Sequence, residues 1–298
     1  GLSPANLRSI RDAMTRPYGL ILICGPTGCG KTTTLHSVMR ELNTGTRKIW
    51  TAEDPVEITQ EGLRQVQVNP RIGWTFAAAM RTFLRADPDV IMIGEMRDEE
   101  TARIAVEASL TGHLVMSTLH TNSAPESITR LLEIGLDPYM FSDSLLAIMA
   151  QRLVRRLCTA CRVPIVLDDR ALHELARLWR ESAGGRGEDE GTLVARWKAA
   201  ARVGDERGDE GGEDVGVRGW RRAGCARCDH TGYHGRLGLH ELRRAADRVR
   251  ERIRRRAPAS ELQAAGLDTG MITLRQDGIE KVLAGLTDLP EVLAASNT

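Results

Sequence analysis

The sequence is poor in aromatic residues and in excess charge, and it lacks long hydrophobic runs. Phe, Trp and Tyr make up 4% of its 298 residues, and the formal net charge at pH 7 is +1. Few aromatic side chains means few of the stacking surfaces that single-stranded nucleic-acid binders use. No apolar run approaches the roughly 20 residues of a membrane-spanning helix. These absences argue against nucleic acid as a partner and against a transmembrane span.

A secretory signal is also missing, so we expect a cytoplasmic protein. The chain begins with Gly1 rather than Met, and we therefore expect further residues before it in the complete protein. A length of 298 residues allows about two domains. The shares of hydrophobic (42%) and charged (27%) residues are ordinary for a soluble globular protein.

The clearest pattern present is a glycine-rich loop between an apolar run and a helix. Leu20–Cys24 predicts a buried strand, residues 25–32 read Gly-x-x-x-x-Gly-Lys-Thr, and residues 33–42 predict a helix. In this context the loop N–H groups and the helix N-terminus bind a polyphosphate, Lys31 reaches the β- and γ-phosphates, and Thr32 holds Mg²⁺. A simple glycine turn is the alternative, and the full spacing disfavours it. The predicted nucleotide-binding residues are Gly25, Pro26, Thr27, Gly28, Cys29, Gly30, Lys31, Thr32 and Thr33.

Helices and strands alternate from the N-terminus to about Ala150. The pattern predicts helices over 4–14, 33–42, 75–85 and 99–110, and strands over 20–24, 48–52, 90–93 and 113–118. This alternation predicts an α/β fold with a doubly wound, RecA-like parallel sheet. Such sheets bind ligands at the carboxyl ends of their strands, where this sequence has Glu53, Glu95 and His120.

The composition changes after Ala150. Residues 184–216 contain nine glycines and nine acidic residues, which predicts a flexible linker with a short helix around 193–201; a functional acidic arm is the alternative. Thirteen arginines follow between 218 and 256, and helical patterning runs from 274 to 293. We predict an ATPase core over 1–150, a zinc-binding module over 151–240 and a C-terminal helical region over 241–298.

Two Cys-x-x-Cys pairs predict a structural zinc site. The four residues are Cys158, Cys161, Cys225 and Cys228. Four thiolates complete a tetrahedral Zn²⁺ and leave no open position for catalysis. The 63 residues between the pairs exceed the spacing of a zinc ribbon, but doubling a loop costs only about 0.6 kcal/mol and a structural zinc contributes on the order of 10 kcal/mol. Unrelated buried or disulfide-bonded cysteines are the alternative, and His230 and His234 are near enough to be substitute ligands.

Four segments resemble the Walker A, Asp-box, Walker B and His-box motifs of the secretion-superfamily ATPases. They are residues 25–32, 52–57, 87–95 and 112–122. The paired cysteines and residues 232–236 and 273–278 resemble the type II secretion and type IV pilus assembly ATPases rather than the pilus retraction ATPases, which lack these cysteines. The resemblance covers nearly the whole chain and leaves secretion and pilus assembly as open alternatives.

The resemblance implies roles that phosphoryl-transfer chemistry supports, because this reaction needs positioning and charge neutralisation. Glu95 would polarise the attacking water or hold Mg²⁺ through water. Glu53 would be a second carboxylate, and Glu57 is a weaker candidate. His120 would sense the γ-phosphate, and His113 is a second candidate for this role. The candidate donors of positive charge are Arg81, Arg85 and Arg97, and in this family such donors also come from an N-terminal domain or a neighbouring subunit.

The function implied is that of a ring-forming motor, hexameric by resemblance, that uses ATP, Mg²⁺ and Zn²⁺. It would drive pilin or pseudopilin assembly from the cytoplasmic face of the inner membrane, where a polytopic platform protein would hold it. We hypothesise that the basic zinc module makes that contact. Three alternatives are a retraction ATPase, a nucleic-acid translocase, which DNA would stimulate, and a nucleotide-gated scaffold that does not hydrolyse ATP.

Overall fold

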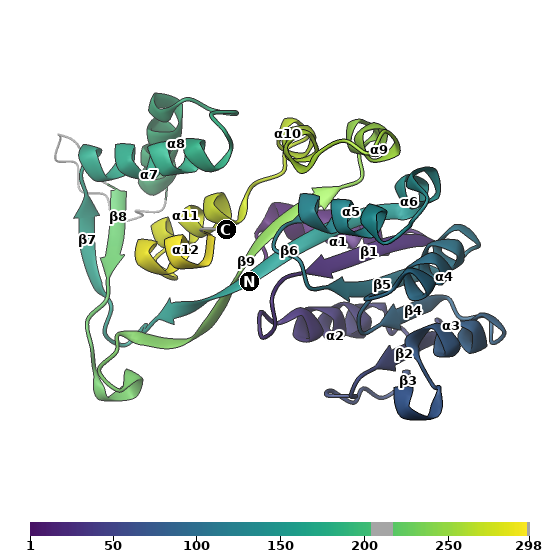
Figure 1. Ribbon diagram of the computed structural model, residues 1–298. Coiled ribbons are helices and arrows are strands. Elements are labelled where there is room, and N and C mark those ends of the chain that lie inside the picture. Colours follow the sequence, from purple (N-terminus) through teal and green to yellow (C-terminus); the bar gives the residue numbers. More distant parts are fainter. Residues whose placement is uncertain (204–216, 297–298) are drawn as a thin grey trace. The chain divides into compact units, whose positions relative to one another are not determined.

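The computed structural model describes residues 1–203 and 217–296 (Figure 1). Residues 204–216 of the predicted linker lie outside the described residues. The chain forms two compact units. The phosphate-loop unit comprises Leu2–Gln151 and His240–Met271, and the tetracysteine unit comprises Gly1, Arg152–Leu239 and Ile272–Thr298. The three-part division with boundaries after 150 and 240 stays a prediction about domains.

A seven-stranded sheet organises the phosphate-loop unit, in the order β3-β2-β4-β5-β1-β6-β9. Neighbouring strands from β3 to β6 pair in parallel. The strands are β1 (Gly19–Cys24), β2 (Ile49–Glu53), β3 (Arg64–Gln67), β4 (Val90–Ile93), β5 (Leu114–Leu119), β6 (Leu145–Leu157) and β9 (Tyr233–Arg244). The chain leaves this unit along β6 and returns to it along β9.

Strands β1, β4 and β5 are buried along their whole length, which explains the continuous apolar sequences of β1 and β4; β5 also carries the buried residues Ser117 and Thr118. Successive side chains of β1 enter different cores. Leu20 and Leu22 join the cluster on one face of the sheet, whereas Ile21 and Ile23 join the cluster on the other. The strands predicted over 20–24, 48–52, 90–93 and 113–118 correspond to β1, β2, β4 and β5, and the predicted α/β class is confirmed.

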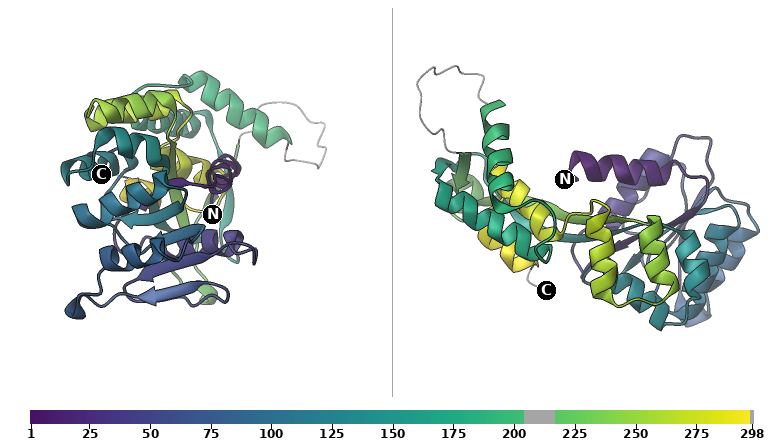
Figure 2. Two further views of the ribbon diagram at one scale, coloured as in Figure 1. Left: turned by 90° about the vertical axis from the view of Figure 1, so that its right-hand side faces the viewer. Right: turned by 90° about the horizontal axis from the view of Figure 1, so that it is seen from above.

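Helices cover both faces of the sheet in this unit. Helices α1 and α2 pack on one face, and α3, α4, α5, α6, α9 and α10 pack on the other (Figure 2, right). Their bounds are α1 (Pro4–Met14), α2 (Lys31–Leu42), α3 (Phe76–Leu84), α4 (Glu99–Leu110), α5 (Ala124–Glu133), α6 (Pro138–Ser144), α9 (Asp247–Arg254) and α10 (Ala259–Asp268), with a 3₁₀ turn at Pro70–Ile72. Hydroxyl and carboxylate N-caps begin several of them; Ser3, for example, accepts from the Asn6 N–H.

The tetracysteine unit is built from short elements around small clusters. They are β7 (Val163–Leu167), α7 (Asp169–Ser182), α8 (Glu190–Val203), β8 (Val217–Arg221), a 3₁₀ turn (Ala226–Cys228), α11 (Leu274–Leu283) and α12 (Leu289–Ser296). Strands β7 and β8 are antiparallel. The helix expected over 193–201 is α8, and its Trp197 packs edge-on against Trp179 of α7 with ring centroids 6.0 Å apart.

The helical pattern over 274–293 is divided between α11 and α12 at Gly285. This glycine has φ +68, and a Cβ there would lie 2.0 Å from Cδ1 of Trp220, so glycine is required on both counts. Arg162 also packs on Trp220: its guanidinium carbon is 4.0 Å from the Trp220 ring centroid. Among the described residues, none of the helices combines the length and hydrophobicity needed to cross a bilayer.

Candidate functional site

The phosphate loop connects β1 to α2 at the carboxyl edge of the sheet. Gly28 and Gly30 have φ +78 and +89, a left-handed conformation that turns successive N–H groups toward one side. A Cβ at Gly28 would meet nothing within 4 Å, so the space beside this exposed glycine is free. Helix α2 begins at Lys31 directly after it. Exposed N–H groups and a helix N-terminus together fit a polyphosphate.

Lys31 is buried, and its ammonium group folds back over the loop. Its Nζ donates to the carbonyl oxygens of Gly25 (2.7 Å) and Pro26 (3.0 Å). These carbonyls neutralise the ammonium group partly, and phosphate oxygens would do so more strongly. Binding of a nucleotide would therefore exchange these two contacts for contacts with phosphate.

Glu95 and His120 come together beside the loop. Glu95 lies two residues after β4 and His120 directly follows β5, which lies between β4 and β1. The Glu95 side chain is 12% exposed; its Oε2 lies 3.1 Å from His120 Nε2 and its Oε1 lies 2.6 Å from Arg97 Nη2. A carboxylate, an imidazole and a guanidinium group thus meet at the strand tips, next to the strand that ends in the phosphate loop.

The three predicted charge donors have different surroundings. Arg97 pairs with Glu95; its side chain is 70% exposed, whereas that of Glu95 is 12% exposed. Because the Arg97 side chain lies largely in solvent, water can hydrate its guanidinium group when it leaves Glu95. Arg81 pairs with Glu100, and both side chains are about half exposed. Arg85 is an exposed residue at the end of α3.

Glu53 is buried at the end of β2 and accepts three hydrogen bonds. Thr51 Oγ1 (2.6 Å) and Gln65 Nε2 (2.9 Å) donate to Oε1, and His36 Nε2 lies 3.0 Å from Oε2. Gln60 Nε2 donates to the His36 carbonyl and is also 2.9 Å from His36 Nδ1. Since this amide nitrogen is a donor, His36 Nδ1 accepts and the Nε2–H donates to Glu53. His36 thus holds the Glu53 side chain through its Nε2–H.

The position of β2 explains why His36 connects Glu53 to the helix after the phosphate loop. Three strand spacings separate β2 from β1, which corresponds to about 14 Å. His36 is on α2, the helix that follows the phosphate loop. Glu53 is therefore joined to the loop's helix rather than to the loop. Glu57, the weaker candidate, is exposed.

His113 lies at the other edge of the sheet. It precedes β5, and its Nδ1 is 3.0 Å from the carbonyl oxygen of Ala108, which only accepts, so Nδ1 carries the proton. A six-residue strand spans about 20 Å, and β5 separates His113 from His120. The structure therefore gives His113 a structural contact with the end of α4 and keeps it away from Glu95.

Sequence reasoning missed two residues that contact the loop or its helix, His36 and Gln151. Gln151 Nε2 donates to the Cys29 carbonyl oxygen (2.7 Å), and Thr34 Oγ1 donates to Gln151 Oε1 (2.8 Å). One signal was available: Gln151 is a polar residue that directly follows the apolar run 145–150, as Glu95 follows 90–93. No local pattern indicated that His36 would meet Glu53.

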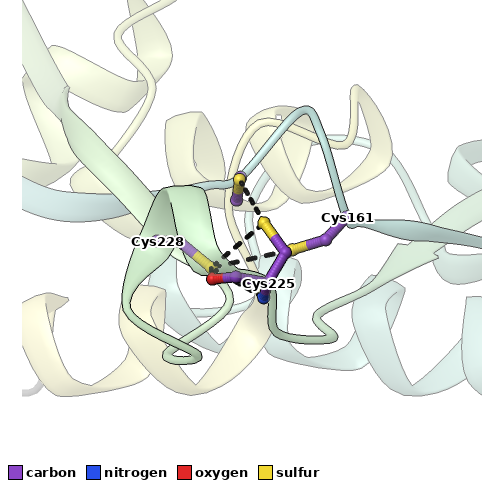
Figure 3. Close-up of side chains that lie close together, drawn as sticks. Cys161, Cys225 and Cys228 are labelled. Carbon is purple, nitrogen blue, oxygen red and sulfur yellow. Dashed lines mark hydrogen bonds between the residues drawn. The ribbon is translucent and has the colours of Figure 1, made fainter.

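The four paired cysteines converge in the tetracysteine unit. Their sulfurs all lie within 4.8 Å of one another (Figure 3). Three of the sulfur–sulfur separations are 3.9 Å (Cys158–Cys225), 3.8 Å (Cys161–Cys228) and 3.8 Å (Cys225–Cys228). A tetrahedron of sulfurs 2.3 Å from zinc has edges of about 3.8 Å. The donor set and its size therefore fit a structural zinc ion, and within the described residues this group contains neither His230 nor His234.

Backbone N–H groups prepare one of these sulfurs for a metal. Burial raises the pKa of the Cys228 thiol, but hydrogen bonds from the N–H groups of Cys225 and Gly232 outweigh this and lower it to about 7. Burial and bonds to neighbouring thiols raise the pKa of Cys161 to about 12. Gly232 has φ +79, and a Cβ there would lie 2.3 Å from the Ala223 carbonyl oxygen, so glycine is required.

Almost the whole chain, including the loop, the strand-end residues and the four cysteines, matches one protein family. Residues 1–294 match the family described as Type II/IV secretion system protein. The chain belongs to this family.

Similar proteins from two bacteria support the same family membership. Type II secretion system protein E of Dickeya dadantii is 43% identical over 98% of this chain and 51% of its own length. Type IV pilus assembly ATPase PilB of Thermus thermophilus is 42% identical over 99% of this chain and 30% of its own length. The chain thus spans about half the length of the secretion-system relative, and less of the pilus ATPase.

Solved structures agree on the fold of this family member. The pilus retraction motor PilT with bound ADP is 27% identical, with a TM-score of 0.64, over 100% of this chain and 66% of that chain. The ATPase DotB of Legionella pneumophila has a TM-score of 0.62 over 99% of this chain and 64% of that chain, at 23% identity. The second likeness concerns the fold alone.

Proposed function

We propose that this family member is the ATP-hydrolysing motor region of a type II secretion or type IV pilus assembly machine. The observation that carries the proposal is the meeting of Glu95 and His120 at the strand tips, beside the strand that ends in the phosphate loop. The names of the relatives, a type II secretion protein E and a pilus assembly ATPase, support the same activity. Pseudopilins or pilins would be the assembled subunits, and a retraction motor, the class of the PilT structure, is the second candidate.

Four residues would have different roles in phosphoryl transfer. Lys31 would move from the Gly25 and Pro26 carbonyls to the β- and γ-phosphates, and Thr32 would hold Mg²⁺. When bound, Mg²⁺ neutralises charge on the phosphates. Glu95 would orient the attacking water after it releases Arg97, and His120 would fix the second oxygen of that carboxylate and sense the γ-phosphate.

Arg97 then becomes a cation near the reacting phosphate, as predicted for the charge donors. Glu53 is buried and already accepts three hydrogen bonds, so we propose that it acts through His36 on α2 rather than by taking a proton from water. Arg81 and Arg85 are further candidates for charge donation, within the chain or across a ring of subunits.

We propose that the four cysteines hold one zinc ion with a structural role. The matching sulfur separations and the two backbone N–H groups on Cys228 support this assignment. Metal analysis of protein purified without chelators should find about one zinc per chain. A hexameric ring and contact with an inner-membrane platform protein, through arginines between 218 and 256, belong to the same proposal.

Phosphate release from Mg-ATP tests the activity. The wild-type chain should release phosphate, and Lys31→Ala and Glu95→Gln should each lower the rate by about 100-fold or more. The first removes positive charge that stabilises the transition state, and the second removes the carboxylate that orients the attacking water. Glu107→Gln, on the exposed side of α4, is the matched control and should leave the rate unchanged. A wild-type chain that binds ATP without releasing phosphate, or a fully active Glu95→Gln variant, would overturn the proposal.

A further inference from the structure

Gln151 connects the sixth strand to both the phosphate loop and its helix. In the register of β6 with β1, Ala150 lies opposite Cys24, so Gln151 lies where β1 turns into the loop. It is 3% exposed. Its amide contacts the Cys29 carbonyl at 2.7 Å and the Thr34 hydroxyl at 2.8 Å. One buried side chain thus holds two points that are five residues apart around the loop.

The orientation of this amide is fixed by its partners. A backbone carbonyl oxygen can only accept, so the amide nitrogen of Gln151 must face Cys29. The amide oxygen then faces Thr34, whose hydroxyl donates to it. Rotating the amide by half a turn would bring two oxygens together at Cys29. The contact is therefore directional.

Holding the Cys29 carbonyl also fixes the next N–H group. In a trans peptide, the carbonyl of one residue and the N–H of the following residue point in opposite directions. Drawing the Cys29 oxygen toward Gln151 turns the Gly30 N–H to the opposite side of the peptide. Gly30 is in the left-handed conformation directly before α2, where a phosphate-binding N–H is needed.

Lys31 holds other carbonyls of the loop, but only while the loop is empty. Its Nζ bonds Gly25 and Pro26 and must leave them to reach a phosphate. The Gln151 contact with Cys29 competes with no phosphate contact. It can persist in both the empty and the nucleotide-bound loop.

We propose that Gln151 is a positioning residue that keeps the phosphate loop in its binding conformation, and that it determines nucleotide affinity more than turnover. The inference rests on the proposed function in that the loop binds a nucleotide. Gln151 touches the loop backbone and not the reacting atoms. Loss of its amide would allow the Cys29–Gly30 peptide to rotate in the empty protein, and part of the binding free energy would then be used to reorder it.

The test is the affinity of the full chain for Mg-ADP, measured by calorimetry, with thermal unfolding of the nucleotide-free protein as a check. Gln151→Met keeps the volume and removes the hydrogen bonds to Cys29 and Thr34. We expect its Kd to rise about tenfold, whereas kcat at saturating Mg-ATP falls less than about threefold. Gln263→Met on α10 is the matched control and should bind as the wild type does. A Gln151→Met variant that is folded and binds within about twofold of wild type would overturn the inference.

A second pair of variants covers the case in which Gln151→Met does not fold. Thr34→Val removes the hydroxyl that holds the Gln151 oxygen, and Thr34→Ser keeps it. We expect Thr34→Val to bind Mg-ADP about threefold more weakly than Thr34→Ser; equal Kd values would contradict the inference. A wild-type chain that fails to bind Mg-ADP at millimolar concentration would refute the proposed function itself, which the variants do not test.

Discussion

The phosphate-loop unit and the tetracysteine unit of this chain are stabilised by different interactions. In the first, buried strands carry apolar clusters on both faces of one sheet, and α1, α2 and six other helices cover them. In the second, the apolar clusters are small and separate. Four sulfurs, stacked arginines and ion pairs connect the remaining elements. A large sheet stabilises itself by burial, whereas a small unit needs cross-links.

Tyr233 illustrates the second mode. The guanidinium carbon of Arg155 is 4.1 Å from its ring centroid, and its hydroxyl donates to Asp288 at 2.7 Å. Arg155 in turn pairs with Glu291 at 2.6 Å. This pair lowers the pKa of Glu291, so its contribution to stability is present at neutral pH and is lost in acid. The comparison predicts that the two units respond to different perturbations.

Metal removal should have the largest effect, and only on the tetracysteine unit. A structural zinc contributes on the order of 10 kcal/mol, which is comparable with the whole stability of a domain. We expect chelation, or Cys225→Ser, to abolish hydrogen-exchange protection in β7, β8 and the segment around Gly232. Strands β1 and β5 should keep theirs, and Mg-ADP binding should persist.

Cys24→Ala is the matched control for that experiment, because Cys24 is buried in β1 and lies outside the cluster. It should leave about one zinc per chain. If β1 also lost its hydrogen-exchange protection after chelation, the prediction that the two units respond differently would be wrong.

A core substitution should destabilise the phosphate-loop unit and not the tetracysteine unit, with a smaller effect than metal removal. Phe83 is 1% exposed in α3 and packs on Trp50 with ring centroids 5.1 Å apart. Phe83→Ala should lower the free energy of unfolding of the phosphate-loop unit by about 3–5 kcal/mol, measured by denaturant titration. Its zinc content should not change. Phe76→Ala, at a half-buried position of the same helix, should cost less, and equal costs would show that burial is not the cause.

The smallest effect is expected in alkali and concerns Tyr233. Burial and the bond to Asp288 raise its pKa to about 12, whereas an unfolded tyrosine titrates near 10. Since the folded state binds this proton more tightly, the contribution is complete below about pH 10 and declines as the pH rises toward about 12. The unfolding midpoint of the tetracysteine unit should fall over this range by more than it does in Tyr233→Phe. Tyr139→Phe, at an exposed position, is the control; a wild-type curve parallel to Tyr233→Phe would contradict the prediction.

Local sequence patterns predicted β1, β2, β4 and β5, the phosphate loop and helices α1 to α4, but not α5, α6, α9, α10, β3 or β6. Leu20–Cys24 and Val90–Ile93 are apolar because both faces of the sheet are covered, so composition alone revealed them. Contacts between distant segments were not predictable in this way. Gln151 reaches Cys29 across 122 positions of sequence, and no periodicity encodes such a pairing. The return of the chain along β9 was missed for the same reason.

The place of β9 beside β6 in the sheet affects the order in which the sheet can form. Strand β9 is the neighbour of β6 in the sheet, yet residues 158–232 lie between them. During synthesis, β6 would remain an open edge, with the associated risk of pairing with another chain, until β9 emerges. Cys158 directly follows β6, and Cys228 lies shortly before β9. A metal ion bound by these cysteines would bring the two ends of the intervening segment together before β9 pairs with β6. The loss of conformational entropy when β9 pairs would then be smaller.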